Sequence, residues 1–196
     1  MDLIFASHNK HKLEEVQEMM GEDLVQLSSL EDIAYYDEII EDGSTLEENA
    51  RIKSNTIYTK TGKDVFSDDT GLEVYALDMQ PGVITARFAG AGKDANANMN
   101  LLLKLLDDKE DRRARFRTAI VLILDGKEYL FEGIVEGRIA FQKSGDMGFG
   151  YDPVFIPEDH DKSFAEMPMA MKNTMSHRHR ALQKMKQFLI NKKDQH

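Results

Sequence analysis

A pair of adjacent aspartates at the end of an apolar run constrains this chain more than any other feature. Val65 and Phe66 predict the end of a buried strand, and Asp68 and Asp69 follow after one serine, before a predicted turn at 70–71. Neighbouring carboxylates repel each other unless a cation lies beside them, and their oxygen ligands suit Mg²⁺. The stretch therefore predicts the metal end of an active site. The alternative is an Asp-rich surface turn.

Length and composition exclude several classes of protein. The 196 residues suffice for one domain with a large core, which could be divided into two lobes around a cleft. The absence of Cys excludes disulfides, Cys-bound zinc and thiol nucleophiles. A net charge of −10 argues against a protein that coats a nucleic-acid polymer, which needs many Lys and Arg. With no membrane-length apolar run and no signal-peptide pattern at the start, we expect a cytoplasmic protein.

The first segments predict a phosphate-binding loop between a strand and a helix. Residues 2–6 form a short apolar run, and Leu13, Val16 and Met20 form a helical stripe. The backbone N–H groups at the start of the helix, together with basic side chains, suit a phosphate. The alternative is a plain strand-to-helix connection with solvated lysines. The loop residues are Ser7, His8, Asn9, Lys10, His11 and Lys12.

A lysine on the apolar stripe of the next helix needs an explanation. Leu46, Ala50, Lys53 and Ile57 follow one another at spacings of four, three and four, so they share one helix face. An inward-facing Lys either extends along the helix edge to water or enters a charged site. The sequence leaves both alternatives open.

The middle of the chain predicts a helix followed by a β-hairpin. Asp94 is a suitable cap for a helix that carries a leucine-rich face. Residues 114–124 and 129–139 have strand patterns, and the Asp125-Gly126 pair between them is a strong hairpin-turn signal.

A glycine-rich segment can present an aromatic ring to a planar ligand. Three glycines within 145–150 surround Phe149, and glycines beside an aromatic residue let the backbone place its ring in an open cleft. A ring placed there can stack on a nucleic base. The alternative is a bend that contains a core Phe.

The last helix starts with two basic side chains. Ser176 is a good N-cap, which places His177 and Arg178 in the first turn, and the apolar residues that follow have helical spacing. Cations at a helix N-terminus oppose the helix dipole, at a cost of roughly 0.3–1 kcal/mol each at exposed sites. A functional role is one reason for the chain to tolerate this placement.

Several separated segments, in the same order, resemble the inosine triphosphate pyrophosphatase family, which acts on non-canonical purine nucleoside triphosphates. The resemblance covers nearly the full length. The chain departs from the family pattern at His8, Met147 and His179. The matching segments are Ser7–Lys12, Leu46–Ala50 with Lys53, Ser67–Leu72, Pro81–Gly82 with Ala86–Gly90, Gly148–Pro153, Ala165–Glu166 and Ser176–Arg178.

The resemblance implies a fold and a reaction. The expected fold is an elongated α/β fold, with a long mixed β-sheet flanked by helices, formed by residues 1–196 as a single domain of two lobes with a substrate cleft between them. The implied reaction is hydrolysis of ITP, dITP and XTP to the monophosphate and pyrophosphate with Mg²⁺ as cofactor. The implied state is a homodimer that binds neither a membrane nor a nucleic-acid polymer.

The resemblance also implies roles for individual residues. Asp69 would position or deprotonate the attacking water, and Glu41, Asp69 and Asp68 would bind Mg²⁺. Phe149 would stack on the purine, whose 6-oxo group would accept from Arg178, a donor mismatched to adenine. The residues expected to bind substrate are Ser7, His8, Asn9, Lys10, His11, Lys12, Lys53, Thr70, Phe149, Gly150, Tyr151, Asp152, Lys172, His177 and Arg178.

Two alternatives remain open at this point. The chain could be a house-cleaning pyrophosphatase for other modified nucleotides, or a nucleotide sensor without chemistry. A pyrimidine preference would favour the first, and tight ITP binding without hydrolysis would favour the second. A sensor could lose its metal carboxylates, whereas Asp68 and Asp69 are both present, which favours catalysis.

Overall fold

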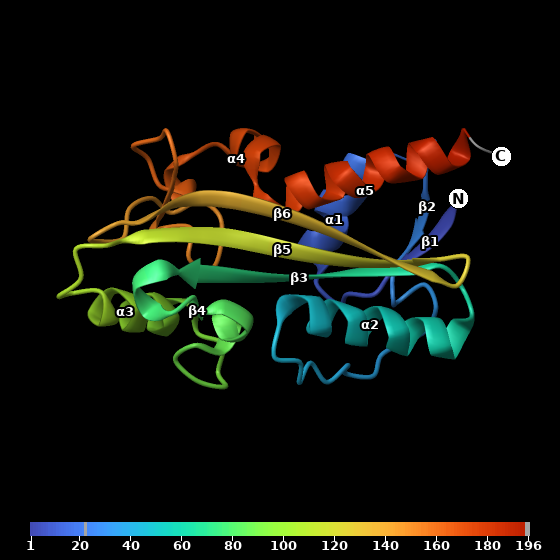
Figure 1. The fold of residues 1–196 in the computed structure, drawn as a ribbon, viewed down its shortest axis with the longest axis horizontal. Helices are drawn as coiled ribbons and strands as arrows, with labels where there is room; N and C mark the ends of the chain where they lie inside the picture. The colour runs from blue at the N-terminus through green and yellow to red at the C-terminus, as the bar shows by residue number, and fades with distance from the viewer. Residues whose placement is uncertain (22, 195–196) are drawn as a thin grey trace. The chain divides into compact units, whose positions relative to one another are not determined.

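The computed structural model describes residues 1–21 and 23–194, which form a mixed α/β fold (Figure 1). Within these residues, seven strands form one sheet in the order β2-β1-β3-β5-β6-β7, with β4 paired to β3. The strands are β1 (Asp2–Phe5), β2 (Gln26–Ser28), β3 (Val65–Val74), β4 (Gln80–Pro81), β5 (Arg113–Leu124), β6 (Lys127–Ile139) and β7 (Phe155–Pro157). The α-helices are α1 (Lys10–Met20), α2 (Leu46–Thr61), α3 (Ala95–Leu105), α4 (Met169–Met175) and α5 (His177–Lys193).

The sheet is mixed because its strands pair in both directions. Strand β1 runs parallel to β2 and to β3, with Ile4 opposite Val65. Strands β3 and β4 pair antiparallel, as do β6 and β7. The predicted hairpin turn between β5 and β6 is confirmed, since Asp125 and Gly126 both have positive φ, as this class of turn requires.

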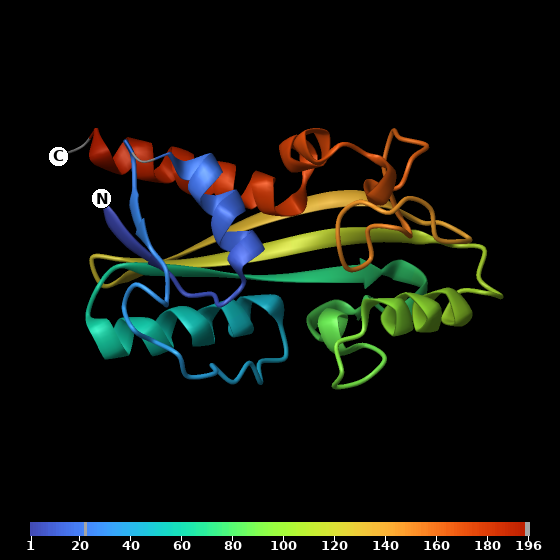
Figure 2. The same cartoon turned by 180° about the vertical axis from the view of Figure 1, so that it is seen from behind.

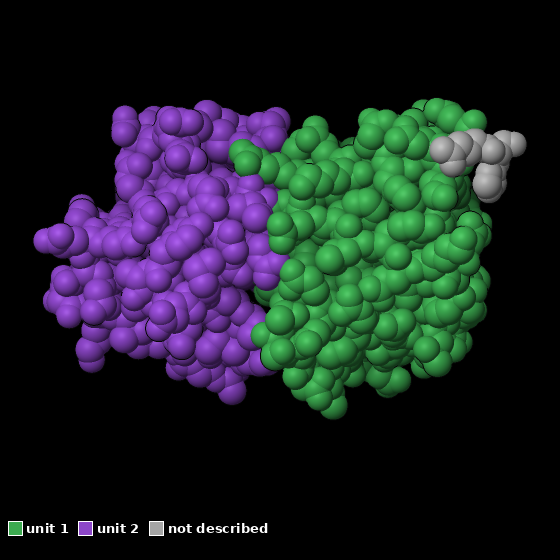
Figure 3. Space-filling view, in the orientation of Figure 1, with its two compact units in different colours: residues 1–69, 118–133, 178–196 green, residues 70–117, 134–177 purple. Residues whose placement is uncertain are grey.

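The chain divides into two compact units, which Figure 3 colours separately. Unit 1 contains residues 1–69, 118–133 and 178–196, and unit 2 contains residues 70–117 and 134–177. The boundaries fall inside β3, β5 and β6 and at the start of α5.

Unit 1 has helices on both faces of its part of the sheet. Helices α1 and α5 lie on one face and α2 on the other, as both views show (Figures 1 and 2). The alternating side chains of the strands serve the two faces in turn: Phe66 joins the apolar cluster with α1 and α5, and Val65 joins the cluster with α2. Burying both faces requires the nearly continuous apolar runs seen in β1 and at the start of β3.

Unit 2 has its own core, which is built around aromatic rings. The rings of Phe116 and Phe155 meet edge to face with centroids 4.6 Å apart, and Phe164 packs against both. Leu102 and Leu106, in and just after α3, are fully buried against this cluster. This core supports the glycine-rich segment that follows β6.

The expected mixed α/β class with a helix-flanked sheet is confirmed. The predicted turn at 70–71 is wrong, because β3 continues without interruption from Val65 to Val74. Strand β7 and helix α4 were not predicted, since both are short and lie in a segment rich in turn residues. No α-helix in residues 1–21 and 23–194 has the length and apolar character that a membrane span requires.

Candidate active site

The loop between β1 and α1 caps its helix through a predicted site residue. Asn9 is the N-cap of α1, and its side-chain oxygen accepts from the Lys12 backbone N–H at 3.2 Å. The Ser7 hydroxyl oxygen accepts from the Asn9 N–H, also at 3.2 Å. These local bonds fix the first turn of α1, and they direct Lys12 toward β3.

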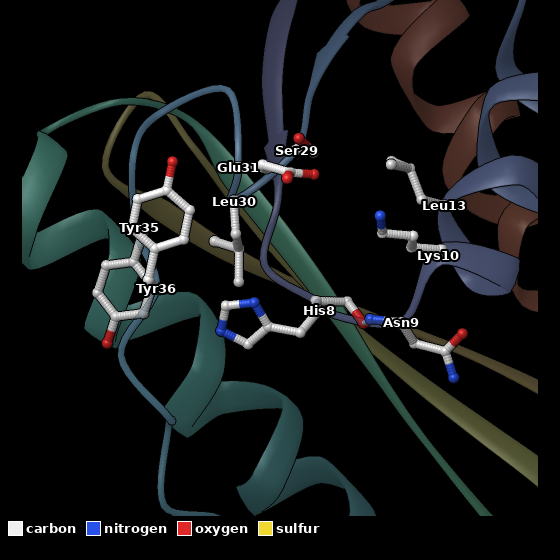
Figure 4. Close-up of a pocket in the computed structure, with 10 residues that line it drawn as sticks. His8, Asn9, Lys10, Leu13, Ser29, Leu30, Glu31, Tyr35 and Tyr36 are labelled. Carbon is white, nitrogen blue, oxygen red and sulfur yellow. Dashed lines mark hydrogen bonds between the residues drawn. The ribbon is translucent and has the colours of Figure 1, made fainter.

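A cavity of about 180 Å³ lies beside this loop (Figure 4). It is placed just beyond the carboxyl ends of the parallel strands β1 and β2, where ligands of parallel sheets commonly bind. His8 links its two walls, because Nε2 lies 3.0 Å from the Asp37 carbonyl oxygen and the ring stacks on Tyr35. The lining residues are Ser7, His8, Asn9, Lys10, Leu13, Ser29, Leu30, Glu31, Tyr35 and Tyr36.

Asp68 lies within a buried ion cluster. Its side chain is 2% exposed, and its two oxygens accept from the Lys12 ammonium at 3.0 and 3.1 Å. Arg178 donates through Nε to Asp68 at 3.1 Å and through Nη1 to Glu15 at 2.5 Å. Burial alone would raise the pKa of Asp68, but Lys12 and Arg178 outweigh it and hold this pKa well below its usual range. Asp68 is therefore ionised and bonded through both oxygens.

Asp69 has different neighbours. Its Oδ2 accepts from the Asn49 side-chain amide at 3.2 Å, and its Oδ1 lies 3.9 Å from the Lys53 ammonium. Lys53 also donates to Glu41 at 2.7 Å. Burial raises the pKa of Asp69, and Glu41 adds to this effect, while the two nearby lysines oppose it. A carboxylate with a raised pKa is a better proton acceptor than an ordinary aspartate.

The pleat of β3 explains why two neighbouring aspartates differ. Successive side chains of a strand point to opposite faces, so Asp68 follows Phe66 toward α1 and α5, while Asp69 follows Ser67 toward α2. A buried bond holds α2 against the strand at this level: the Ser67 hydroxyl donates to the Ala50 carbonyl oxygen at 2.5 Å. The expected inward direction of Lys53 is confirmed by its burial.

Two carboxylates of unit 1 fit the ligand preferences of a hard divalent cation. In the described ranges, no three His, Cys, Asp or Glu side chains converge into a metal-binding group. Glu41 and Asp69, which share Lys53, offer two hard oxygen donors. Mg²⁺ is typically held by one or two carboxylates plus phosphate oxygens and water, so this donor set suits it.

Unit 2 carries the aromatic residue expected to bind the base. Phe149 is 53% exposed, and its backbone N–H donates to the Asp152 carboxylate at 2.8 Å. Lys172, from α4, donates to the same carboxylate at 2.5 Å, and its ammonium lies 4.7 Å from the centre of the Phe149 ring. The glycine-rich segment therefore presents an open ring beside a buried ion pair.

Two further features fix this segment. Gly148 has φ of +79°, and a Cβ at that position would overlap the Asp152 carboxylate, so only glycine fits there. Tyr151 is buried, and its hydroxyl donates to the Thr85 carbonyl oxygen at 2.8 Å. The side chain of Tyr151 thus belongs to the core of unit 2 and anchors the glycine-rich segment to it.

The remaining predicted residues lie in different surroundings. His177, in the first turn of α5, is buried in unit 2 with its ring stacked on Phe116 at a centroid distance of 4.8 Å. Thr70 is half-buried in β3, and Gly150 has φ of +63° beside Phe149. Lys10 and His11 are exposed on α1.

The structure adds two residues that were not among the expected site residues. Asn49 bonds to Asp69, and Glu15 bonds to Arg178. Asn49 lies within the matching segment Leu46–Ala50 and four residues before Lys53 on the same helix, so the resemblance and the helical spacing were both signals that could have found it. Glu15 is separated from Arg178 by 163 residues, and no local pattern connects the two.

Comparison with known proteins finds relatives that match nearly the whole chain. A dITP/XTP pyrophosphatase of Flavobacterium johnsoniae is 50% identical over 185 residues, which cover 94% of this chain and 96% of that protein. A dITP/XTP pyrophosphatase of Bacillus subtilis is 42% identical over 191 residues, 96% of each protein.

Solved structures agree with the fold. The Ham1 protein of Staphylococcus aureus superposes with a TM-score of 0.92 at 35% identity, over 98% of this chain and 100% of that one. A HAM1 protein from Coxiella burnetii gives 0.92 at 34% identity, over 97% and 99%. Residues 3–188 match the Ham1 family, and the chain belongs to that family.

Proposed function

We propose that this chain hydrolyses non-canonical purine nucleoside triphosphates, such as dITP, ITP and XTP, to the monophosphate and pyrophosphate. Family membership and the activity for which the relatives are named support this proposal. The observation that carries it is the setting of Asp69, a partly buried carboxylate with a raised pKa that lies beside an ammonium and a second carboxylate.

In this proposal, Asp69 takes the proton of the attacking water. A bond forms between the water oxygen and the α-phosphorus, the bond from that phosphorus to the bridging oxygen breaks, and pyrophosphate leaves. General bases of this kind contribute about 10²- to 10⁴-fold to a rate. The raised pKa of Asp69 suits the role, because it increases the carboxylate's affinity for the proton.

The cations of unit 1 would bind the triphosphate. Lys12 and Lys53 are each paired with carboxylates, so each ammonium has a fixed place before substrate binds. The N-terminus of α1, capped by Asn9, would offer backbone N–H groups to phosphate oxygens. Fixed donors of this kind stabilise the charge that develops on the phosphoryl oxygens.

We assign the metal role to Glu41 and Asp69. Mg²⁺ bound there would neutralise charge on the phosphate oxygens. For Asp68 we propose a different role from the metal ligand expected on the sequence, since both its oxygens are bonded to cations. Its role would be to hold Lys12 and Arg178 in place.

Stacking on the base is proposed for unit 2, and a separate contact to the base is proposed for Arg178 of unit 1. The exposed ring of Phe149 would stack on the purine, and the Asp152–Lys172 pair beside it would contact polar atoms of the base. Two nitrogens of Arg178 donate to carboxylates, and its guanidinium has five N–H donors in all. A remaining donor would pair with the 6-oxo group of hypoxanthine or xanthine.

A panel of nucleoside triphosphates tests this function. Pyrophosphate release would be measured for ITP, dITP, XTP, GTP, ATP and dUTP, with Mg²⁺ and with EDTA. We expect release from the first three, a requirement for Mg²⁺, and a kcat/KM for ATP lower by about 10²-fold or more. A preference for dUTP, or nucleotide binding without any release, would contradict the proposal.

We also propose that the protein is a homodimer and that it lies in the cytoplasm. Analytical ultracentrifugation would test whether it forms a dimer.

A further inference from the structure

Asn49 connects two parts of the proposed active site through one buried amide. It is the fourth residue of α2 and is 3% exposed. Its Oδ1 accepts from the Gly43 backbone N–H at 2.9 Å, and its Nδ2 donates to Asp69 Oδ2 at 3.2 Å. Gly43 follows Glu41 by two residues, so the amide joins the segment that carries one metal carboxylate to the side chain of the other.

The two bonds fix the orientation of the amide. A backbone N–H can only donate, so the atom of Asn49 that faces Gly43 must be the oxygen. The nitrogen then faces Asp69, whose ionised carboxylate can only accept. Reversing the amide would break both bonds, so the two bonds together fix the orientation of the Asn49 side chain.

The fit around Gly43 provides independent support. A Cβ on Gly43 would lie 2.7 Å from Asn49 Oδ1 and 2.7 Å from Glu48 Cβ, so any larger residue would displace the segment or the helix. The close approach that only glycine allows brings the Gly43 N–H within bonding distance of Asn49.

The helix also holds Asn49 at a fixed place along β3. The bond from the Ser67 hydroxyl to the Ala50 carbonyl fastens α2 two residues before Asp69 on the same face of the strand. Lys53 comes one helical turn after Asn49 and lies near Asp69 Oδ1, while Asn49 binds Oδ2. The two oxygens of Asp69 therefore face two different side chains of one helix.

We propose that Asn49 is a positioning residue for the hydrolysis: it sets the orientation of the Asp69 carboxylate and fixes the Glu41-bearing segment relative to it. The proposal rests on the function proposed above. It assigns Asn49 no contact with the substrate, so its loss should lower kcat far more than it raises the KM for ITP.

Two substitutions separate the two bonds. Asn49→Asp keeps an oxygen for the Gly43 N–H but replaces the donor to Asp69 with a second carboxylate. Asn49→Leu removes both bonds. We expect Asn49→Asp to lower kcat about 100-fold, the usual effect of a small misplacement of a reacting group, with KM changed less than about threefold.

Asn98 offers a matched control. It is the fourth residue of α3 and is also 3% exposed. Its side chain bridges two backbone groups, accepting from Ala89 N–H at 2.7 Å and donating to the Ala86 carbonyl oxygen at 2.9 Å. Asn98→Asp therefore imposes a similar cost on folding in unit 2, without a carboxylate partner. We expect its kcat to stay within about threefold of wild type.

Amide hydrogen exchange at Gly43 gives a readout that needs no activity. Protection of this amide should persist in Asn49→Asp and fall at least about tenfold in Asn49→Leu, since only the second variant lacks the acceptor. Crystal structures of the two variants should show the Asp69 carboxylate turned from its wild-type orientation in both.

Failure of the positioning role and failure of the proposed function give different results. Wild-type kcat in Asn49→Asp, an equal loss in Asn98→Asp, or unchanged Gly43 protection in Asn49→Leu would overturn the positioning role. If the wild-type protein releases no pyrophosphate from any nucleotide, the proposed function fails on its own. Gly43 exchange and the orientation of Asp69 in the variant crystals would then still decide whether Asn49 positions these groups.

Discussion

Asp68 and Asp69 are neighbours in the sequence and have opposite surroundings in the structure. Asp68 is 2% exposed and bonded to Lys12 and Arg178, which hold its pKa down. Asp69 has a side chain that is 16% exposed, and burial raises its pKa. The strand sends one carboxylate into an ion cluster beneath α1 and α5, and the other toward α2.

The difference shows how one acidic pair can serve two purposes. A buried carboxylate needs bonded cations to remain charged, and Asp68 meets this need with two of them. Asp69 bonds to a neutral amide and lies 3.9 Å from the Lys53 ammonium, and burial raises its pKa. We propose that the first arrangement holds Lys12 and Arg178 in place, whereas the second suits proton transfer.

The largest expected effect follows from removing the charge of Asp69. Asp69→Asn should lower the kcat for ITP by about 10³-fold, because the amide cannot accept the water proton. The fold should persist, since the neutral side chain still fits beside Asn49 and Lys53. Pyrophosphate release measures the rate and circular dichroism the fold. Turnover within threefold of wild type would refute the assigned role.

Removing a cation from the other aspartate should affect stability strongly. Arg178→Met leaves Asp68 with Lys12 alone and deprives Glu15 of its partner, so the free energy of unfolding should fall by about 3 kcal/mol. Arg180→Met is the control, because Arg180 lies exposed on the same helix. Urea denaturation would measure the free energy of unfolding of both variants. Equal losses would show that the buried ion pairs of Arg178 add no more stability than an exposed arginine does.

Acidification should erase the stabilisation that Asp68 provides. Its pKa is lowered in the folded protein, so its contribution is present above the unfolded value of about 3.9 and is lost as the pH falls through the folded value. The gap in unfolding free energy between wild type and Asp68→Asn should narrow by about 2 kcal/mol from pH 5 to pH 2. A gap independent of pH would mean that the variant acts through packing alone.

The smallest effect concerns the helix that faces Asp69. The Thr45 hydroxyl accepts from the Glu48 backbone N–H at 3.1 Å and caps α2. Thr45→Ala should lower the free energy of unfolding by about 1 kcal/mol. Because Ser67 still bonds to Ala50 in the second turn of the helix, kcat should change less than about twofold. Thermal denaturation together with the ITP assay would check this separation.

The sequence predicted the elements of this molecule better than it predicted the contacts of its charged groups. Periodicity located α2 and placed Lys53 on its inner face, and the structure confirms that direction. The Asp-Gly pair correctly located the turn between β5 and β6. These signals are local, so they can be recognised within a few residues.

The ion pairs of Asp68 could not be predicted because its partners are distant in sequence. Lys12 is separated from it by 56 residues and Arg178 by 110. The predicted turn at 70–71 also led to a wrong expectation for the directions of the two side chains. In a turn, Asp68 and Asp69 could face one cation, whereas in a continuous strand they point to opposite faces. Recognising β3 as unbroken would have predicted that the two carboxylates have different neighbours.

The most direct test of this account is the free energy of unfolding of Asp68→Asn and Asp69→Asn, measured side by side in urea at pH 7. Asp68→Asn leaves Lys12 and Arg178 buried without their anion and should lose about 3 kcal/mol or more. Asp69→Asn should match or slightly exceed wild-type stability, because it replaces a carboxylate whose charged form the fold disfavours. Equal losses in the two variants, or the reverse order, would contradict the division of roles between these neighbours.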